Sequence, residues 1–105
     1  MNATTEKQLI ELTNAEERLV YAMQLLGDKT RFKIFKLLMT KKDMCVTEIA
    51  AELGISPSAV SQHFRSFELV GFVNKERVGQ KICYILKHDN PLVDELVHVV
   101  SRVKE

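Results

Sequence analysis

The spacing of apolar residues changes at Gly71, and this change constrains the fold more than any other sequence feature. Before Gly71, apolar residues recur every three or four positions, the period of helices that bury one face. After it, Phe72–Val78 and Lys81–Leu86 alternate with a period near two, which is typical of strands. The Gly79–Gln80 pair between them predicts a hairpin turn. The sequence therefore predicts a mainly α-helical body with one small β-hairpin, an α+β arrangement.

The first apolar segment has helical spacing from about Thr5 to Leu26. Asn14 and Glu17 have the spacing of a capping box, which would divide this segment into two helices. Gly27 is expected to end the segment in the left-handed conformation that glycine adopts without a steric penalty.

Asp28 predicts the N-cap of a second helical segment, which continues to about Thr40. Its apolar residues are expected to be buried, and its basic residues are expected to face water. The apolar set is Phe32, Ile34, Phe35, Leu37 and Leu38. The basic set is Lys29, Arg31, Lys33 and Lys36.

Residues 47–69 contain two helical segments joined by a tight turn. Thr47 predicts the N-cap of the first helix, which ends at Gly54. Ser56 predicts the N-cap of the second helix, and Pro57 follows at a position where a missing N–H costs nothing. Alanines at the helix crossing, a glycine in the turn and a second helix with one polar face are features of a helix-turn-helix.

The second helix of this motif has two chemically different faces. Three apolar residues at i, i+4 and i+7 are expected to face inward: Val60, Phe64 and Phe67. The other face carries small and hydrogen-bonding side chains, and residues 56–67 contain no acidic residue. Gln62 can pair bidentately with adenine, and Arg65 can pair with guanine or a phosphate. We therefore predict that residues 56–68 enter the DNA major groove.

The hairpin at 72–86 is expected to act as a wing, because it carries basic side chains that can meet phosphates. Ser56 and Ser58 also suit a phosphate, since they lie at the start of a helix. His63 has two open interpretations, a phosphate contact or a brace between the helix and the domain. The candidate DNA-contacting residues are Ser56, Ser58, Ala59, Ser61, Gln62, His63, Arg65, Lys75, Arg77 and Lys81.

The distribution of charge agrees with a polyanionic partner, although the net charge of the 105 residues is only +1. Residues 28–55 carry six basic and four acidic side chains, and residues 56–88 carry five and two. Residues 1–27 and 89–105 each carry two basic and four acidic side chains. A positive middle suits nucleic acid, and negative ends suit parts held away from it.

Several functional classes are disfavoured by what the sequence lacks. It has no apolar run long enough to span a membrane and no secretory signal, so a cytoplasmic protein is expected. It shows no nucleophile paired with a base, no clustered carboxylates and no phosphate-binding glycine loop, so no enzyme activity and no cofactor are expected.

These features together resemble the ArsR family of bacterial winged-helix repressors, over about residues 19–88. The segment 26–34, LGDKTRFKI, is similar to the family's opening motif. Residues 58–64, SAVSQHF, are similar to its recognition helix, and residues 69–73, LVGFV, to its exit. Residues 79–86, GQKICYIL, are similar to its wing.

The resemblance implies a homodimer that binds an imperfect inverted repeat in double-stranded DNA and is released by an effector, often a metal ion or a thiol oxidant. It also implies one winged helix-turn-helix domain over residues 1–105, with dimerisation helices at 1–27 and 90–105. Asn90 and Pro91 predict the start of the last helix independently. The apolar residues of that helix form one stripe: Leu92, Leu96, Val99, Val100 and Val103.

The metal-binding patterns of the family are incomplete in this chain, so no metal site is expected. The family's arsenic-type pair of cysteines is reduced here to Cys45, because position 47 is threonine. The family's site on the last helix would fall on His88, Asp89 and Asn90 with Ser101 and Lys104, which is a broken ligand set. His98 is alone in an apolar run, so His88 and His98 are expected at the surface or in dimer packing.

Cys45 and Cys83 allow a further hypothesis. Met44–Val46 is predicted as a short strand, and in a winged helix such a strand pairs with the second wing strand, which holds Cys83. The two thiols would then be close enough to oxidise or to share a soft metal. The favoured interpretation is that both are reduced and buried, as small apolar residues.

Two alternatives to a ligand-released repressor remain open at this point. One is a constitutive repressor that has no sensor site. The other is a winged helix used for protein contact, in which the basic surface is incidental.

Overall fold

The computed structural model describes residues 10–41 and 44–104. These residues form five helices and three strands. The helices and strands are α1 (Asn14–Leu26), α2 (Lys29–Thr40), β1 (Met44–Cys45), α3 (Val46–Leu53), α4 (Pro57–Leu69), β2 (Val73–Val78), β3 (Lys81–Leu86) and α5 (Pro91–Ser101).

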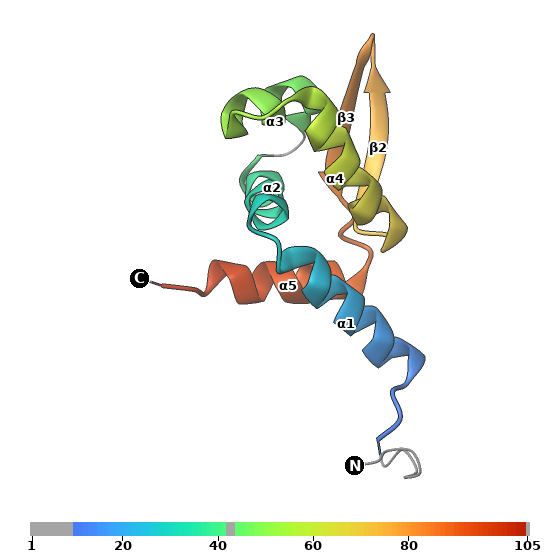
Figure 1. Ribbon diagram of the computed structural model, residues 1–105. Coiled ribbons are helices and arrows are strands. Elements are labelled where there is room, and N and C mark those ends of the chain that lie inside the picture. The colour runs from blue at the N-terminus through green and yellow to red at the C-terminus, as the bar shows by residue number, and fades with distance from the viewer. Residues whose placement is uncertain (1–9, 42–43, 105) are drawn as a thin grey trace.

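The three strands form one antiparallel sheet in the order β1-β3-β2. Figure 1 shows that the tip of the β2–β3 hairpin and the start of α4 lie at the same end of the molecule. Helices α1 and α5 lie toward the opposite end. The predicted architecture of a helical body with one hairpin is confirmed, including the pairing of β1 with β3.

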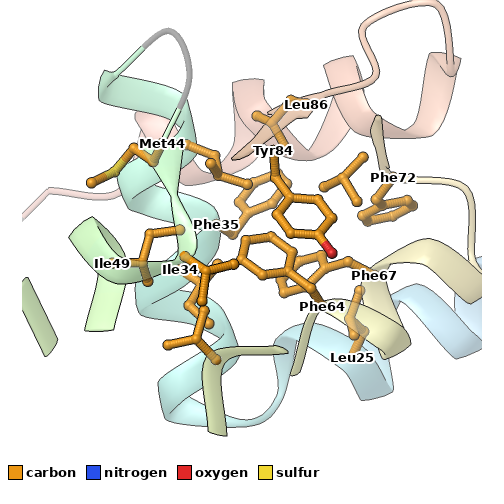
Figure 2. Packing of buried hydrophobic residues seen from close by; sticks show 14 of the residues in the cluster. Leu25, Ile34, Phe35, Met44, Ile49, Phe64, Phe67, Phe72, Tyr84 and Leu86 are labelled. Atoms are coloured by element: carbon orange, nitrogen blue, oxygen red, sulfur yellow. The ribbon is translucent and has the colours of Figure 1, made fainter. Parts of the chain in front are cut away.

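The core lies between the helices and the sheet (Figure 2). Phe35, Phe64, Phe67 and Phe72 are all at most 1% exposed. The ring of Phe64 stacks on the ring of Tyr84 with centroids 3.8 Å apart and planes inclined by 6°. Burial of each such aromatic side chain stabilises the fold by roughly 2–3 kcal/mol. The core therefore fixes the inner face of α4 against β3.

The start of α1 differs from the sequence-based expectation. Its N-cap is Thr13, whose hydroxyl accepts from the N–H of Glu16 at 3.0 Å, while the Glu16 carboxylate accepts from the N–H of Thr13 at 2.9 Å. The predicted capping box at Asn14 and Glu17 was wrong by one residue, because threonine and asparagine are adjacent here and both can cap a helix. Residues 10–13 are not helical, and the predicted start at Thr5 lies outside the described residues.

At the junction of α1 and α2, the structure differs from two further predictions. Gly27 has φ of −74°, so the predicted left-handed cap was wrong; the chain passes directly to Asp28, the confirmed N-cap of α2. Arg31 does not lie on the solvent face with the lysines. Its Nε donates to the carbonyl of Leu25 at 2.7 Å, which satisfies the exposed end of α1. Phe32 is half-buried, whereas Ile34 is fully buried.

The N-cap of α3 was also predicted too late by two residues. Cys45 is the N-cap and Val46 is already helical, so Thr47 lies within the first turn. The Glu48 carboxylate accepts from the N–H of Cys45 at 2.9 Å. The same residue thus ends β1 and begins α3, which leaves no loop between the strand and the helix-turn-helix.

Asn90 connects the end of α4 with the start of α5. Its side-chain oxygen accepts from the N–H of Leu92 at 3.0 Å and caps α5, as predicted. Its side-chain nitrogen donates to the carbonyl of Gly71 at 2.9 Å. One half-buried side chain therefore joins α5 to the turn that follows α4.

Candidate nucleic-acid interface

The turn between α3 and α4 is built on a left-handed glycine. Gly54 has φ of +68°, and the N–H of Ile55 donates to the carbonyl of Ala50 at 3.1 Å. This bond closes the C-terminal end of α3 in the manner of a Schellman motif. A side chain at position 54 would be strained in this conformation, so the glycine allows the sharp change of direction.

The first turn of α4 uses the two residues that the sequence indicates. The hydroxyl of Ser56 accepts from the N–H of Ala59 at 3.0 Å, and Pro57 follows in the first turn. The Ser56 oxygen is therefore occupied as a cap acceptor, and only its O–H remains to donate to a phosphate. Ser58 is exposed beside it.

The two faces of α4 separate as the spacing predicts. Val60, Phe64 and Phe67 are each 0% exposed. The side chains on the outer face follow at helical spacing and are all exposed: Ser58, Ser61, Gln62 and Arg65. Ala59 is half-buried at the edge of this face. The structure thus brings the central candidates onto one open, acid-free surface.

His63 is a half-buried residue of α4. The pKa of the Asp28 carboxyl is lowered mainly by the hydrogen bond from the N–H of Arg31, and also by the charges of Arg31 and His63. The partial burial of the His63 side chain favours the bracing interpretation.

The basic residues of the wing divide between the two faces of the sheet. Lys75 is paired across the strands with Tyr84, and Arg77 with Ile82, so these two lie on the face packed against α4. Lys81 alternates with Ile82 and lies on the opposite face, with Cys83. All three basic side chains are exposed.

Lys75 has a carboxylate neighbour, which makes it the weakest phosphate candidate of the wing. Its Nζ lies 3.9 Å from the Glu68 carboxylate on α4, and both side chains are substantially exposed. Such a pair contributes little to stability but partly cancels the positive charge. Within the described part of the chain, Arg65, Arg77 and Lys81 form no ion pair.

One exposed residue at the wing tip was absent from the sequence-based set. Gln80 lies between Gly79 and Lys81 at the end of the hairpin, where an amide can reach a minor groove. The position of Gln80 in the predicted turn could have identified it. It was not included because the wing candidates were selected for positive charge.

The two cysteines are joined, contrary to the favoured interpretation of two separate reduced thiols. Cys45 of β1 and Cys83 of β3 are register partners, and their sulfur atoms form a disulfide. Cys83 is 2% exposed, whereas Cys45 is half-buried. The pairing of β1 with β3 was expected from the winged-helix pattern, and it brings the two cysteines together although they are far apart in the sequence.

No group of three metal-ligating side chains comes together within residues 10–41 and 44–104. His88 and Asp94 form a pair, with Nδ1 and Oδ1 2.8 Å apart, and both are exposed. His98 is exposed on α5. None of the helices in these two ranges is both long and apolar enough to cross a membrane.

A helix-turn-helix followed by a β-hairpin wing makes this chain a winged helix-turn-helix protein. Residues 28–75 match the family described as bacterial regulatory protein, arsR family. This match covers just under half of the chain and agrees with the resemblance found in the sequence.

Two relatives and one solved structure illustrate the match. The cadmium resistance transcriptional regulatory protein CadC of Listeria innocua is 29% identical over 65 residues, 62% of this chain and 55% of that protein. The match thus spans little more than half the length of CadC. A transcriptional repressor SmtB homolog of Synechocystis is 26% identical over 95% of this chain and 74% of that protein. HlyU from Vibrio cholerae shares the fold, with a TM-score of 0.77 at 23% identity over 87% of this chain and 96% of that one.

Proposed function

We propose that this protein is a homodimeric repressor of transcription that binds an imperfect inverted repeat in double-stranded DNA. The observation that carries the proposal is the outer face of α4, which is exposed and free of acidic side chains over residues 56–67. The start of α4 lies at the same end of the molecule as the wing tip (Figure 1). The protein acts in the cytoplasm in this proposal, because its DNA is there.

In this proposal α4 lies in the major groove with its N-terminal half against the bases. Gln62 and Arg65 have the reach and the donors for bidentate contacts to adenine and guanine. Ser58 and Ser61 are short, so the helix can approach the base edges closely, and Ala59 can contact a thymine methyl group. Ser56 donates to a phosphate at the start of the helix.

The wing supplies the phosphate contacts that orient α4. Arg77 and Lys75 lie on the α4 side of the sheet, and Lys81 lies near the tip on the other face. Phosphate contacts fix register without reading sequence. Arg77 is a stronger candidate than Lys75, since Lys75 is partly neutralised by Glu68.

A second copy of the chain is the proposed partner for the apolar surface of α1 and α5. The exposed fraction reaches 61% for Met23 of α1 and 59% for Val99 of α5. Large apolar side chains that are exposed on α1 and on α5 indicate an interface. A two-fold dimer presents two copies of α4, and a pseudo-palindromic operator mirrors that symmetry.

The test is the DNA affinity of matched variants, measured by fluorescence anisotropy on the duplex upstream of the gene and on a scrambled duplex. Arg65→Ala is expected to weaken specific binding by about 10- to 100-fold. Lys29→Ala removes a positive charge that is also exposed, at the start of α2, and is the control, with an expected change below about threefold.

The salt dependence of binding supplies the second readout. Affinity for the specific duplex must fall steeply with salt, because phosphate contacts release counterions. Binding that is insensitive to salt, or equal losses from Arg65→Ala and Lys29→Ala, would overturn the proposed interface and favour a protein-contact role.

A further inference from the structure

We propose that Cys45 and Cys83 are a reversible thiol–disulfide site, and that the disulfide raises DNA affinity by holding the wing in register with the helix-turn-helix. The inference rests on the proposed DNA-binding function for its effect on affinity. The site itself, the pair of sulfur atoms between β1 and β3, stands on the structure.

The expected effect of the disulfide on DNA affinity follows from the position of the two cysteines in the chain. The bond joins residues 38 positions apart, and the closed loop contains α3, the turn, α4, β2 and the hairpin tip. Every candidate DNA-contacting residue, from Ser56 to Lys81, lies inside this loop. The loop closed by the disulfide therefore contains all of the candidate DNA-contacting residues, whereas α1, α2 and α5 lie outside it.

The non-covalent connection across the same boundary is short. β1 has two residues, and its register with β3 consists of the pairs Met44 with Tyr84 and Cys45 with Cys83. Because Cys45 is also the N-cap of α3, the disulfide links the first residue before the helix-turn-helix directly to the second wing strand. Reduction leaves this short ladder, side-chain packing and the exposed Lys75–Glu68 ion pair among the contacts that hold the wing.

The two cysteines differ in exposure to solvent, and this difference determines which thiol reacts first with an oxidant. Cys45 is half-buried, whereas Cys83 is 2% exposed. With hydrogen peroxide as the oxidant, the Cys45 thiolate attacks one oxygen, an S–O bond forms, the O–O bond breaks, and hydroxide leaves and takes up a proton as water. The Cys83 sulfur then attacks the Cys45 sulfur; the S–S bond forms, the S–O bond breaks, and a second water leaves with the Cys83 proton. Two thiols lose two electrons, and one peroxide is reduced to two waters.

The expected direction follows from preorganisation. DNA binding requires the wing and α4 to contact the same duplex together, and a link that restricts their relative motion lowers the entropy lost on binding. In a reducing compartment such bonds are transient and serve redox sensing more often than permanent stabilisation. The disulfide form is therefore the form with higher affinity.

The test compares the wild-type protein oxidised with hydrogen peroxide and reduced with dithiothreitol, each after removal of the reagent. Titration should find two free thiols per chain in the reduced form and none in the oxidised form, with monomer mobility on a non-reducing denaturing gel. Reduction should lower Tm by about 10 °C or more, because the closed loop is long. It should weaken binding to the specific duplex by about 10-fold.

Cys45→Ser is the matched control, since its half-exposed position tolerates a hydroxyl and no bond can form. Its affinity and Tm should not respond to peroxide followed by reagent removal. Cys83→Ala provides the same test from the buried partner. Equal affinities of the two wild-type forms, or tighter binding by the reduced form, would overturn the inference. Binding by neither form would overturn the proposed function as well, and the Tm difference would still report whether the crosslink forms.

Discussion

The two ends of this molecule are both exposed, but they are exposed for different reasons. The end that carries the start of α4 and the wing tip presents serine, glutamine, arginine and lysine side chains, which water solvates well. The end that carries α1 and α5 presents apolar side chains such as Met23 and Val99. Exposed polar residues can persist without any partner, whereas a cluster of exposed apolar residues is unfavourable until something covers it.

The apolar end, formed by α1 and α5, is the one that requires a permanent contact. In the proposed dimer, α1 and α5 are always covered, and α4 with the wing is open until DNA arrives. The same division appears in the charge distribution, which is positive in the middle of the chain and negative at its ends.

The inner face of α4 should matter to both ends, and its outer face to only one. Phe64→Ala is expected to lower the free energy of unfolding by about 4 kcal/mol, because it removes a ring at 0% exposure that stacks on Tyr84. Arg65→Ala, one residue away on the exposed face, should change it by less than about 0.5 kcal/mol. Urea denaturation of both variants measures the difference. Similar losses in the two would mean that α4 does not have the two faces described.

A charge placed on the apolar end should separate the subunits without unfolding them. Val99→Glu is expected to shift the protein from dimer to monomer in size-exclusion chromatography with light scattering, since an uncompensated carboxylate would be buried at the interface. Affinity for a duplex with two half-sites should fall by about 100-fold or more, because the second contact is no longer tethered to the first.

Ser101→Glu places the same carboxylate on the opposite side of α5 and is the control for this charge. It should leave both the dimer and the DNA affinity unchanged. A Val99→Glu protein that remained dimeric would place the subunit contact elsewhere on the molecule.

The stability that the Asp28 carboxylate contributes at the start of α2 should depend on pH. The pKa of Asp28 is lowered below its ordinary value of 3.8, mainly by the hydrogen bond from the N–H of Arg31. A lowered pKa in the folded state means that the carboxylate contributes stability above pH 3.8 and loses that contribution as the pH falls through the folded-state value. Asp28→Asn keeps the cap but cannot titrate, so its Tm should fall less than that of the wild type between pH 4.5 and about 2.5. Parallel Tm curves for the two proteins over this range would contradict the assignment.

Much of the fold could be predicted because local signals were unambiguous. Ser56 followed by Pro57, Asn90 followed by Pro91 and the glycine at 54 each had one structural interpretation. The period-two alternation gave β2 and β3 to within one residue. The two faces of α4 followed from spacing alone, since three buried residues at i, i+4 and i+7 leave only one outward side.

The remaining features depend on contacts between distant parts of the chain. Arg31 has the sequence context of a solvated basic residue, but its guanidinium bonds to the carbonyl of Leu25 at the end of another helix. Gly27 is a residue type typical of a left-handed helix cap, but α2 begins directly after it, and its backbone is in the right-handed conformation. Cys45 and Cys83 are 38 positions apart, so their bond depends on sheet register, which no local pattern contains.

The side chain of Asn90 has a consequence for the spacing of the DNA site. It holds the start of α5 to Gly71, directly after α4, through bonds of 2.9 and 3.0 Å. In the proposed dimer, α5 packs near the two-fold axis and each α4 lies about 17 Å from it, half of a helical turn of DNA. In the proposed dimer, an amide that does not contact DNA therefore helps to fix the position of α4 relative to the two-fold axis.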